Sequence, residues 1–138
     1  FAVEMFLLSG NELVINEISP RVHNSGHHTL EAGAVSQFHQ HVRAICDLPL
    51  VAPGQEAPQA DMRNLLYSDS LEFLLDYPGG PLTCDRDQVI LHWYGKHEPR
   101  PGRKMGHITC LCADSDEANR RMNRFIQRLR ESPTGAAA

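Results

Sequence analysis

The chain opens with FAVEMFLLSGNELVINEISP (residues 1–20), in which two apolar runs lie on either side of a polar turn. Gly10 and Asn11 stand at the centre of that turn, and both residue types tolerate a positive φ angle. Such a pair between two apolar runs is a strong signal for a β-hairpin with a two-residue loop. The opening residues therefore predict two antiparallel strands joined at Gly10-Asn11.

The register of this hairpin brings two acidic residues together. With Gly10 and Asn11 as the loop, Phe6 lies opposite Ile15 and Glu4 lies opposite Glu17. Opposed carboxylates repel each other on a sheet, and a bound dication turns that repulsion into attraction. Mg²⁺ takes such oxygen ligands, together with substrate phosphates and water. The hairpin alone leaves a second interpretation open, in which a bulge or another register turns one carboxylate to solvent.

A segment rich in polar side chains follows the hairpin. Arg21 offers a planar fork suited to carboxylate or phosphate oxygens, and His23 stands close behind it. Asn24 and Ser25 add neutral donors, and Gly26 permits close approach of the backbone. A loop that only satisfies its own backbone is the alternative, but it does not explain an arginine beside two candidate metal carboxylates. The segment therefore predicts a binding site for an anion.

Composition and charge narrow the class of protein. The 138 residues are 41% apolar and 22% charged, as in globular proteins, and the net charge of −4 gives no general reason to expect binding to nucleic acid. The apolar opening is too short to cross a bilayer, has no basic leader, and is interrupted by Glu4. The cysteine spacing fits no disulfide framework. We expect a cytoplasmic protein that does not bind membranes.

The rest of the chain alternates between periodic segments and breaks. Thr29 is expected to cap a helix that reaches about Ile45, and a proline-rich stretch at 49–60 is expected to separate two domains, residues 1–50 and 51–138. Beyond it the patterns predict strands at 62–67, 89–94 and 104–112, a short helix at 70–77, and an interruption of regular secondary structure at 78–81. An α/β (α+β) fold is predicted, with a small, mixed, β-rich second domain.

A terminal amphipathic helix is the clearest element of the second half. Asp114 with Glu117 loosely matches a capping box. Five residues at helical spacing are expected to form the buried face: Ala118, Met122, Phe125, Ile126 and Leu129.

A basic loop between the last two predicted strands is a second candidate site. Lys96, Arg100, Arg103 and Lys104 surround Pro101-Gly102, and a stiff loop with this charge is able to hold a phosphate. Charges on loops are also commonly just solvated, so the loop by itself leaves both interpretations open.

Several segments together resemble one family of enzymes. They are similar to the end of the ATP-grasp domain, and to the region that follows it, in 5-(carboxyamino)imidazole ribonucleotide synthases. The resemblance covers most of the chain and rests on residues 2–6, 16–27, 36–38, 41–44, 48–50, 91–96 and 100–107.

The resemblance implies roles for the residues of the first half. Glu4 and Glu17 would hold Mg²⁺ against the phosphates of ATP, and Asn16 would lie beside the same nucleotide. Arg21 and His23 would be catalytic residues that contact bicarbonate or the carboxyphosphate made from it.

The resemblance also implies a third catalytic residue and a substrate site. Asn24 would help shape the bicarbonate pocket, and Lys96 and Arg103 would bind the phosphate of 5-aminoimidazole ribonucleotide. The implied enzyme is a carbon–nitrogen ligase of purine biosynthesis that carboxylates this ribonucleotide with bicarbonate, using ATP and Mg²⁺, and that is a homodimer at full length.

Three other functions remain as alternatives. They are a formate-dependent ATP-grasp enzyme that formylates glycinamide ribonucleotide, a biotin-dependent carboxylase, and a non-catalytic ATP-grasp remnant that acts as a binding module. The chain contains no glycine-rich nucleotide loop and no candidate adenine pocket. We therefore expect a C-terminal fragment that by itself neither hydrolyses ATP nor carboxylates a substrate.

Overall fold

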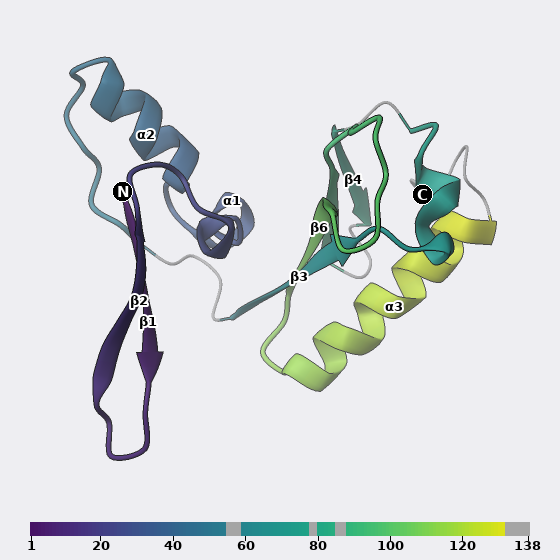
Figure 1. Ribbon diagram of the computed structural model, residues 1–138, viewed down its shortest axis with the longest axis horizontal. Helices are drawn as coiled ribbons and strands as arrows, with labels where there is room; N and C mark the ends of the chain where they lie inside the picture. Colours follow the sequence, from purple (N-terminus) through teal and green to yellow (C-terminus); the bar gives the residue numbers. More distant parts are fainter. Residues whose placement is uncertain (55–58, 78–79, 85–87, 132–138) are drawn as a thin grey trace. The chain divides into compact units, whose positions relative to one another are not determined.

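The chain divides into two compact units, Phe1–Glu56 and Ala57–Ala138. The structure is a computed structural model, and it describes residues 1–54, 59–77, 80–84 and 88–131 (Figure 1). The first unit holds a two-stranded sheet and short helices, and the second holds a four-stranded antiparallel sheet with a long C-terminal helix. The predicted mixed α/β fold class is confirmed. None of the described helices is both long enough and apolar enough to span a membrane.

The predicted hairpin is present, but its loop is longer than expected. Strand β1 (Ala2–Leu7) pairs antiparallel with β2 (Leu13–Ser19), and the Leu8 amide donates to the Glu12 carbonyl at 2.8 Å. Gly10 has a φ angle of 88° and Asn11 one of 62°, so both adopt the positive φ that the sequence predicted. The loop nevertheless comprises three residues, because Ser9 does not pair with Glu12.

A bulge restores the pairing of the two glutamates. The three-residue loop moves every partner by one position, so Phe6 lies opposite Val14, and the predicted Phe6–Ile15 pair is wrong. The register then shifts between Glu4 and Met5. Asn16 is the extra residue on β2, and beyond it Glu4 pairs with Glu17 as predicted. The two offsets cancel, so the prediction for the carboxylates is confirmed by a different geometry from the one assumed.

The single helix predicted from Thr29 to Ile45 is two helices. Helix α1 (Thr29–Ala32) ends where Gly33 adopts an extended conformation with ψ of 143°, and α2 (Gln37–Ile45) begins after Ser36. The Ser36 hydroxyl accepts a hydrogen bond from the amide of His39 at 3.2 Å, so Ser36 is the N-cap of α2. Thr29 is not a cap, since its hydroxyl donates to the Gly26 carbonyl at 2.6 Å. A glycine and a good capping residue in close succession explain the break.

The second unit is built on one sheet with the strand order β3-β6-β5-β4. Strands β3 (Ala60–Leu66), β5 (Val89–Trp93) and β6 (Lys104–Leu111) agree with the three predicted strands to within two residues, and a 3₁₀ helix, η2 (Asp69–Leu74), stands where the short helix was predicted. Strand β4 (Gly80–Cys84) was not predicted, because the glycine and proline at its start, Gly80-Pro81, indicated a break. It lies at the sheet edge, where Pro81 needs no amide for a further neighbour.

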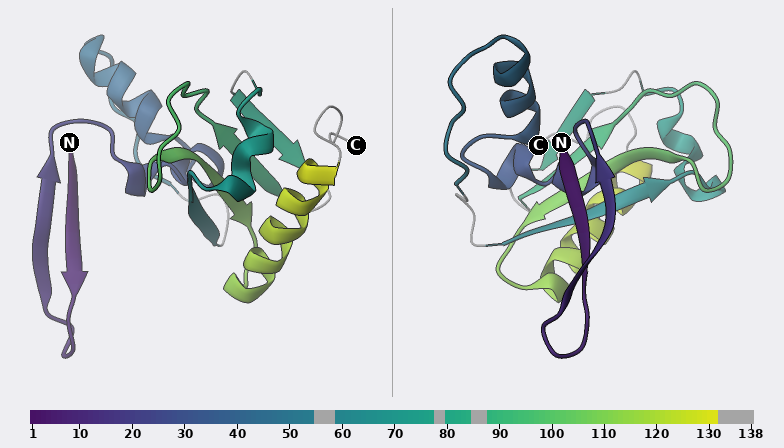
Figure 2. Two further views of the ribbon diagram at one scale, coloured as in Figure 1. Left: turned by 45° about the vertical axis from the view of Figure 1, so that its right-hand side comes forward. Right: turned by 60° about the vertical axis from the view of Figure 1, so that its left-hand side comes forward.

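Helix α3 (Ser115–Glu131) covers one face of this sheet and encloses the core of the unit (Figures 1 and 2). The Asp114 carboxylate accepts from the Glu117 amide at 2.7 Å and caps the helix as predicted. Hydrogen bonds from Arg121 and Arg120 engage the Glu117 carboxylate and lower its pKa to about 2, so Glu117 does not complete a capping box. The predicted buried face is confirmed, with Ala118, Met122, Phe125 and Leu129 buried and Ile126 partly buried.

Gly106 is required for close packing between the two central strands. It lies opposite Trp93, and a Cβ at this position would stand 2.5 Å from the His92 carbonyl oxygen and 3.2 Å from the Trp93 ring. We expect Gly106→Ala to lower the free energy of unfolding by about 3 kcal/mol, because the backbone itself must move. Chemical denaturation measures this change.

Gly102→Ala is the matched control, since a Cβ there meets no atom within 4 Å and only the φ angle of 77° is unfavourable. That variant should lose about 1 kcal/mol. Equal losses in the two variants would contradict the packing role of Gly106.

Candidate functional site

Three side chains of the first unit meet at the base of the hairpin. Glu4 comes from β1 and Glu17 from β2, and His23 follows in the connecting segment. His23 Nδ1 lies 3.3 Å from Glu4 Oε1, and His23 Nε2 lies 2.9 Å from Glu17 Oε1. One ligand atom from each of the three lies within 4.8 Å of the others. The structure therefore gathers two oxygen donors and one nitrogen donor at a point where a metal ion is able to bind.

The bulge contributes a fourth side chain to this group. Asn16 Nδ2 donates to Glu4 Oε2 at 3.3 Å. The additional residue on β2 thus serves to place an amide beside the carboxylate pair, in agreement with the frequent use of bulges to redirect side chains near functional sites.

Ser25 contacts the same ring nitrogen of His23 as Glu4 does. The Ser25 amide donates to His23 Nδ1 at 3.4 Å, and the Ser25 hydroxyl lies 2.8 Å from the same nitrogen. Nδ1 thus has Ser25 and Glu4 as neighbours and Nε2 has Glu17, so the ring is held between the two carboxylates.

Gln37 fixes the backbone on which His23 stands. The His23 amide donates to Gln37 Oε1 at 2.9 Å, and Gln37 Nε2 donates to the His23 carbonyl at 2.7 Å. The same Nε2 lies 2.9 Å from Nδ1 of His27. Gly26 leaves room for the Gln37 side chain, because a Cβ at position 26 would stand 2.6 Å from Gln37 Oε1. Sequence reasoning assigned no role to Gln37, and no local pattern signals a bond between a side chain and a backbone 14 residues away.

Replacing Gln37 with Leu should release this segment. We expect a loss of about 2 kcal/mol in the free energy of unfolding, because the amide and carbonyl of His23 lose their partners. We also expect the ¹⁵N chemical shifts of the His23 imidazole to change, because the ring loses the backbone support that holds it between the two carboxylates.

Gln40→Leu is the matched control, because Gln40 makes the same pair of backbone bonds to Val51 instead. It should lose similar stability without changing the His23 shifts. A Gln37→Leu spectrum that leaves the His23 ring unchanged would show that Gln37 does not hold it.

Arg21 and Asn24 lie in the same segment of the chain as His23. The Arg21 side chain is exposed and donates from Nη1 to the Val22 carbonyl at 3.0 Å. Asn24 begins the 3₁₀ helix η1 (Asn24–Gly26), where its carbonyl accepts from the His27 amide at 3.1 Å. A cavity of about 360 Å³ opens next to Arg21, and its other lining residues are Phe1, Val22, Gln37, Gln40, His41, Ala44 and Leu50.

The second candidate group lies in the second unit, on the connection from β5 to β6. Lys96 Nζ donates to the Lys104 carbonyl at 2.5 Å. Arg103 donates from Nη1 to the Glu98 carbonyl, and Nη1 also lies 3.9 Å from the Glu98 carboxylate. Glu98 is 85% exposed, so this ion pair is weak. The two predicted phosphate ligands are thus held on the same loop by backbone oxygens.

The cations of this loop lie close enough to influence one another. Partial burial lowers the pKa of Lys96, and repulsion from Arg103 and from Lys104 lowers it further. A bound anion would relieve that repulsion, so the loop has the charge distribution of an anion site.

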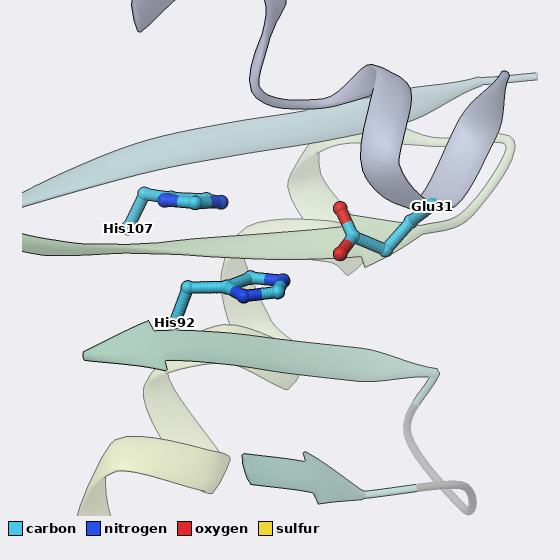
Figure 3. Close-up of side chains that lie close together, drawn as sticks. All are labelled: Glu31, His92 and His107. Atoms are coloured by element: carbon cyan, nitrogen blue, oxygen red, sulfur yellow. The ribbon is translucent and has the colours of Figure 1, made fainter. Parts of the chain in front are cut away.

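Two histidines stack on the strands that this loop joins. His92 on β5 pairs with His107 on β6, and the ring centroids lie 4.6 Å apart with 16° between the planes. Figure 3 shows the two rings one above the other on neighbouring strands. His107 also lies 2.8 Å from the hydroxyl of Tyr94. Both histidines lie in segments that carry the family resemblance, 91–96 and 100–107, but that resemblance implied no role for them.

Comparison with protein families gives two matches along the chain. A model of the phosphoribosylaminoimidazole carboxylase C-terminal domain matches residues 60–121, and a model of the ATP-grasp domain matches residues 1–38. The ATP-grasp match lies in the first unit, and the match to the carboxylase C-terminal domain lies in the second unit.

Similar proteins carry names from one enzyme family. The N5-carboxyaminoimidazole ribonucleotide synthase of Bacillus subtilis is 45% identical over 128 residues, which are 89% of this chain and 32% of that protein. The crystal structure of N5-carboxyaminoimidazole ribonucleotide synthetase from Thermotoga maritima has a TM-score of 0.69 and 42% identity, over 91% of this chain and 34% of that one.

A third relative was crystallised with ligands. It is the N5-carboxyaminoimidazole synthase of Aspergillus clavatus in complex with ADP and 5-aminoimidazole ribonucleotide, with a TM-score of 0.68 and 36% identity, over 94% of this chain and 34% of that one. The chain spans about a third of the length of these three relatives.

Proposed function

Because the chain belongs to the N5-carboxyaminoimidazole ribonucleotide synthases, whose C-terminal region it matches, we propose that it forms part of an ATP-dependent ligase. The reaction joins bicarbonate to the amine of 5-aminoimidazole ribonucleotide and converts ATP to ADP and phosphate. The observation that supports it best is the carboxylate pair at the base of the hairpin, where Glu4 and Glu17 face each other within reach of one ion.

The donor set at this pair fits a magnesium ion. Mg²⁺ prefers oxygen ligands and is usually bound through one or two carboxylates plus substrate phosphates. Glu4 and Glu17 would hold it, and Asn16 would orient Glu4 through the bond from Nδ2. When bound, the ion neutralises charge on the phosphates of ATP. Glu4 is 33% and Glu17 is 53% exposed at the side chain, which leaves their oxygens accessible to a nucleotide.

The residues beside the pair would handle bicarbonate. Arg21 presents an exposed guanidinium suited to a planar anion, and the His23 imidazole lies 3.3 Å from Glu4 and 2.9 Å from Glu17. Asn24 would shape the pocket from the first residue of η1. Bicarbonate attacks the γ-phosphate of ATP to give carboxyphosphate, and the amine then takes the carboxyl group and releases phosphate. These residues would bind and orient the anion and exclude water, because carboxyphosphate hydrolyses.

The loop of the second unit would bind the ribonucleotide. Lys96 and Arg103 carry charges that repel each other in the absence of an anion, and the phosphate of 5-aminoimidazole ribonucleotide supplies that anion. A related synthase was crystallised with this ribonucleotide. Cytoplasmic location and assembly as a homodimer at full length belong to the same proposal.

A chimera tests the proposal. The region of the Bacillus subtilis synthase that this chain matches, 32% of that protein, would be replaced by residues 1–138. We expect ADP release that requires both 5-aminoimidazole ribonucleotide and bicarbonate. A folded chimera, judged by circular dichroism and thermal unfolding, that lacks this activity would contradict the proposal.

The same chimera decides between the proposal and its alternatives. Dependence on formate and glycinamide ribonucleotide would favour the formylating ATP-grasp enzyme instead. Binding of ATP without turnover would favour a non-catalytic module. The 138-residue chain alone is expected to release no ADP.

A further inference from the structure

The ammonium group of Lys96 is held in place by two neighbours. It lies over the ring of Tyr94, 5.1 Å from the ring centroid, and it donates to the Lys104 carbonyl at 2.5 Å. A lysine on a loop ordinarily samples many rotamers and loses that freedom when it binds a ligand. Lys96 has already lost much of it, so the structure presents a preorganised cation.

Tyr94 is fixed by the sheet. It is the first residue after β5, and its amide donates to the Met105 carbonyl at 2.9 Å. Gly95 follows with a φ angle of 63°, which favours glycine, and this turn directs the chain so that Lys96 reaches back over the Tyr94 ring.

The hydroxyl of Tyr94 has an anchor of its own. It lies 2.8 Å from Nδ1 of His107, a residue of β6 that is 2% exposed and stacks on His92. Burial raises the pKa of Tyr94, which favours the neutral phenol. The ring is therefore attached to a central strand at its polar end and presents its face to Lys96.

We propose that Tyr94 is a positioning residue for substrate binding, which holds the Lys96 ammonium where that group meets the phosphate of 5-aminoimidazole ribonucleotide. The inference rests on the proposed function, because it assumes that Lys96 binds this phosphate. The face of an aromatic ring attracts a cation, and that attraction opposes the repulsion from Arg103 and Lys104. A cation that is already held in its bound position loses less conformational entropy on binding than a mobile cation does.

A nuclear magnetic resonance measurement on the 138-residue chain without ligand tests the positioning itself. The Cε protons of Lys96 should be shifted upfield by the Tyr94 ring. Tyr94→Leu should remove the shift. Tyr94→Phe keeps the ring but loses the bond to His107, so it should keep part of the shift with greater mobility at Cε. Tyr77→Leu, in the same unit, is the control and should change nothing at Lys96. An unchanged shift in Tyr94→Leu overturns the inference.

Titration with 5-aminoimidazole ribonucleotide tests the effect on binding. We expect the dissociation constant to rise about tenfold in Lys96→Met, about fivefold in Tyr94→Leu and about twofold in Tyr94→Phe, with no change in Tyr77→Leu. The riboside without phosphate should bind the variants and the unaltered chain equally.

The variants distinguish the assignment of Lys96 to the phosphate from the positioning role of Tyr94. If Lys96→Met binds the ribonucleotide as well as the unaltered chain does, or if the unaltered chain does not bind it, the phosphate assignment fails and the inference fails with it. If Lys96→Met weakens binding but Tyr94→Leu does not, the phosphate assignment stands and the positioning role of Tyr94 is wrong.

Discussion

Glu17→Gln in the chimera should lower ADP release about 1,000-fold or more while leaving the fold intact. The substitution removes a charge but keeps the size of the side chain. Glu17 Oε1 lies 2.9 Å from His23 Nε2, and Glu17 faces Glu4 across the hairpin. A site with a single carboxylate would attract Mg²⁺ much more weakly, and the phosphates of ATP would lose their main source of charge neutralisation. The rate of ADP release at saturating substrates measures the effect.

Glu12→Gln is the matched control for this substitution. Glu12 lies on the same hairpin, is exposed, and contributes its carbonyl to the loop bond with Leu8. It should retain full activity. Binding of Mn²⁺, followed by broadening of the Glu4 and Asn16 resonances in the 138-residue chain, supplies a readout apart from turnover. If the Glu17→Gln variant remains active and Mn²⁺ still broadens these resonances, Glu17 is not a ligand of the metal ion.

The hairpin shows both the strength and the limit of prediction from sequence. The Gly10-Asn11 pair indicated a turn with positive φ angles, which the structure confirms. Turn residues do not fix the length of a loop, however, and a one-residue bulge at Asn16 leaves no trace in composition. The facing of Glu4 and Glu17 was therefore predicted from a register that is wrong over the outer half of the strands.

Long periodic segments were predicted best, because many residues support the same conclusion. Helix α3 has a buried stripe that recurs over the whole element, and a capping aspartate before it. The predicted helix from Thr29 to Ile45 had a similar stripe, but Gly33 and Ser36 allow a break whose occurrence depends on the bonds of Thr29 and Gln37. Those bonds join segments that a local pattern does not compare.

Only part of the candidate site was predicted, because a local pattern does not show contacts between distant segments of the chain. Charged side chains with unusual neighbours, such as Glu4 or Lys96, are visible in the sequence. The residues that position them are neutral and lie elsewhere in the chain. Gln37 holds His23 from α2, and Tyr94 holds Lys96 from the end of β5. Their role depends on contacts made only after folding, so spacing could not predict it.

Phe125→Ala should lower the free energy of unfolding by about 4 kcal/mol, the largest loss expected from one side chain of the second unit. Phe125 lies in the middle of α3 and is 1% exposed, among the core residues of the sheet. Its removal leaves a cavity between α3 and the sheet, and the loss is a large fraction of the stability of a typical domain. Chemical denaturation of the 138-residue chain, followed through the fluorescence of Trp93 in the same core, measures it.

Two further variants separate cavity formation from a general weakening of the helix. Phe125→Leu refills most of the space and should lose only about 1 kcal/mol. Gln127→Ala lies on the same helix with an exposed side chain and should change stability by less than about 0.5 kcal/mol. If Phe125→Ala lost no more than Gln127→Ala, the packing of α3 on the sheet would not be the source of stability in this unit. Binding of 5-aminoimidazole ribonucleotide should weaken with Phe125→Ala only near its unfolding transition, because the loop that carries Lys96 and Arg103 joins strands β5 and β6 and needs the folded sheet.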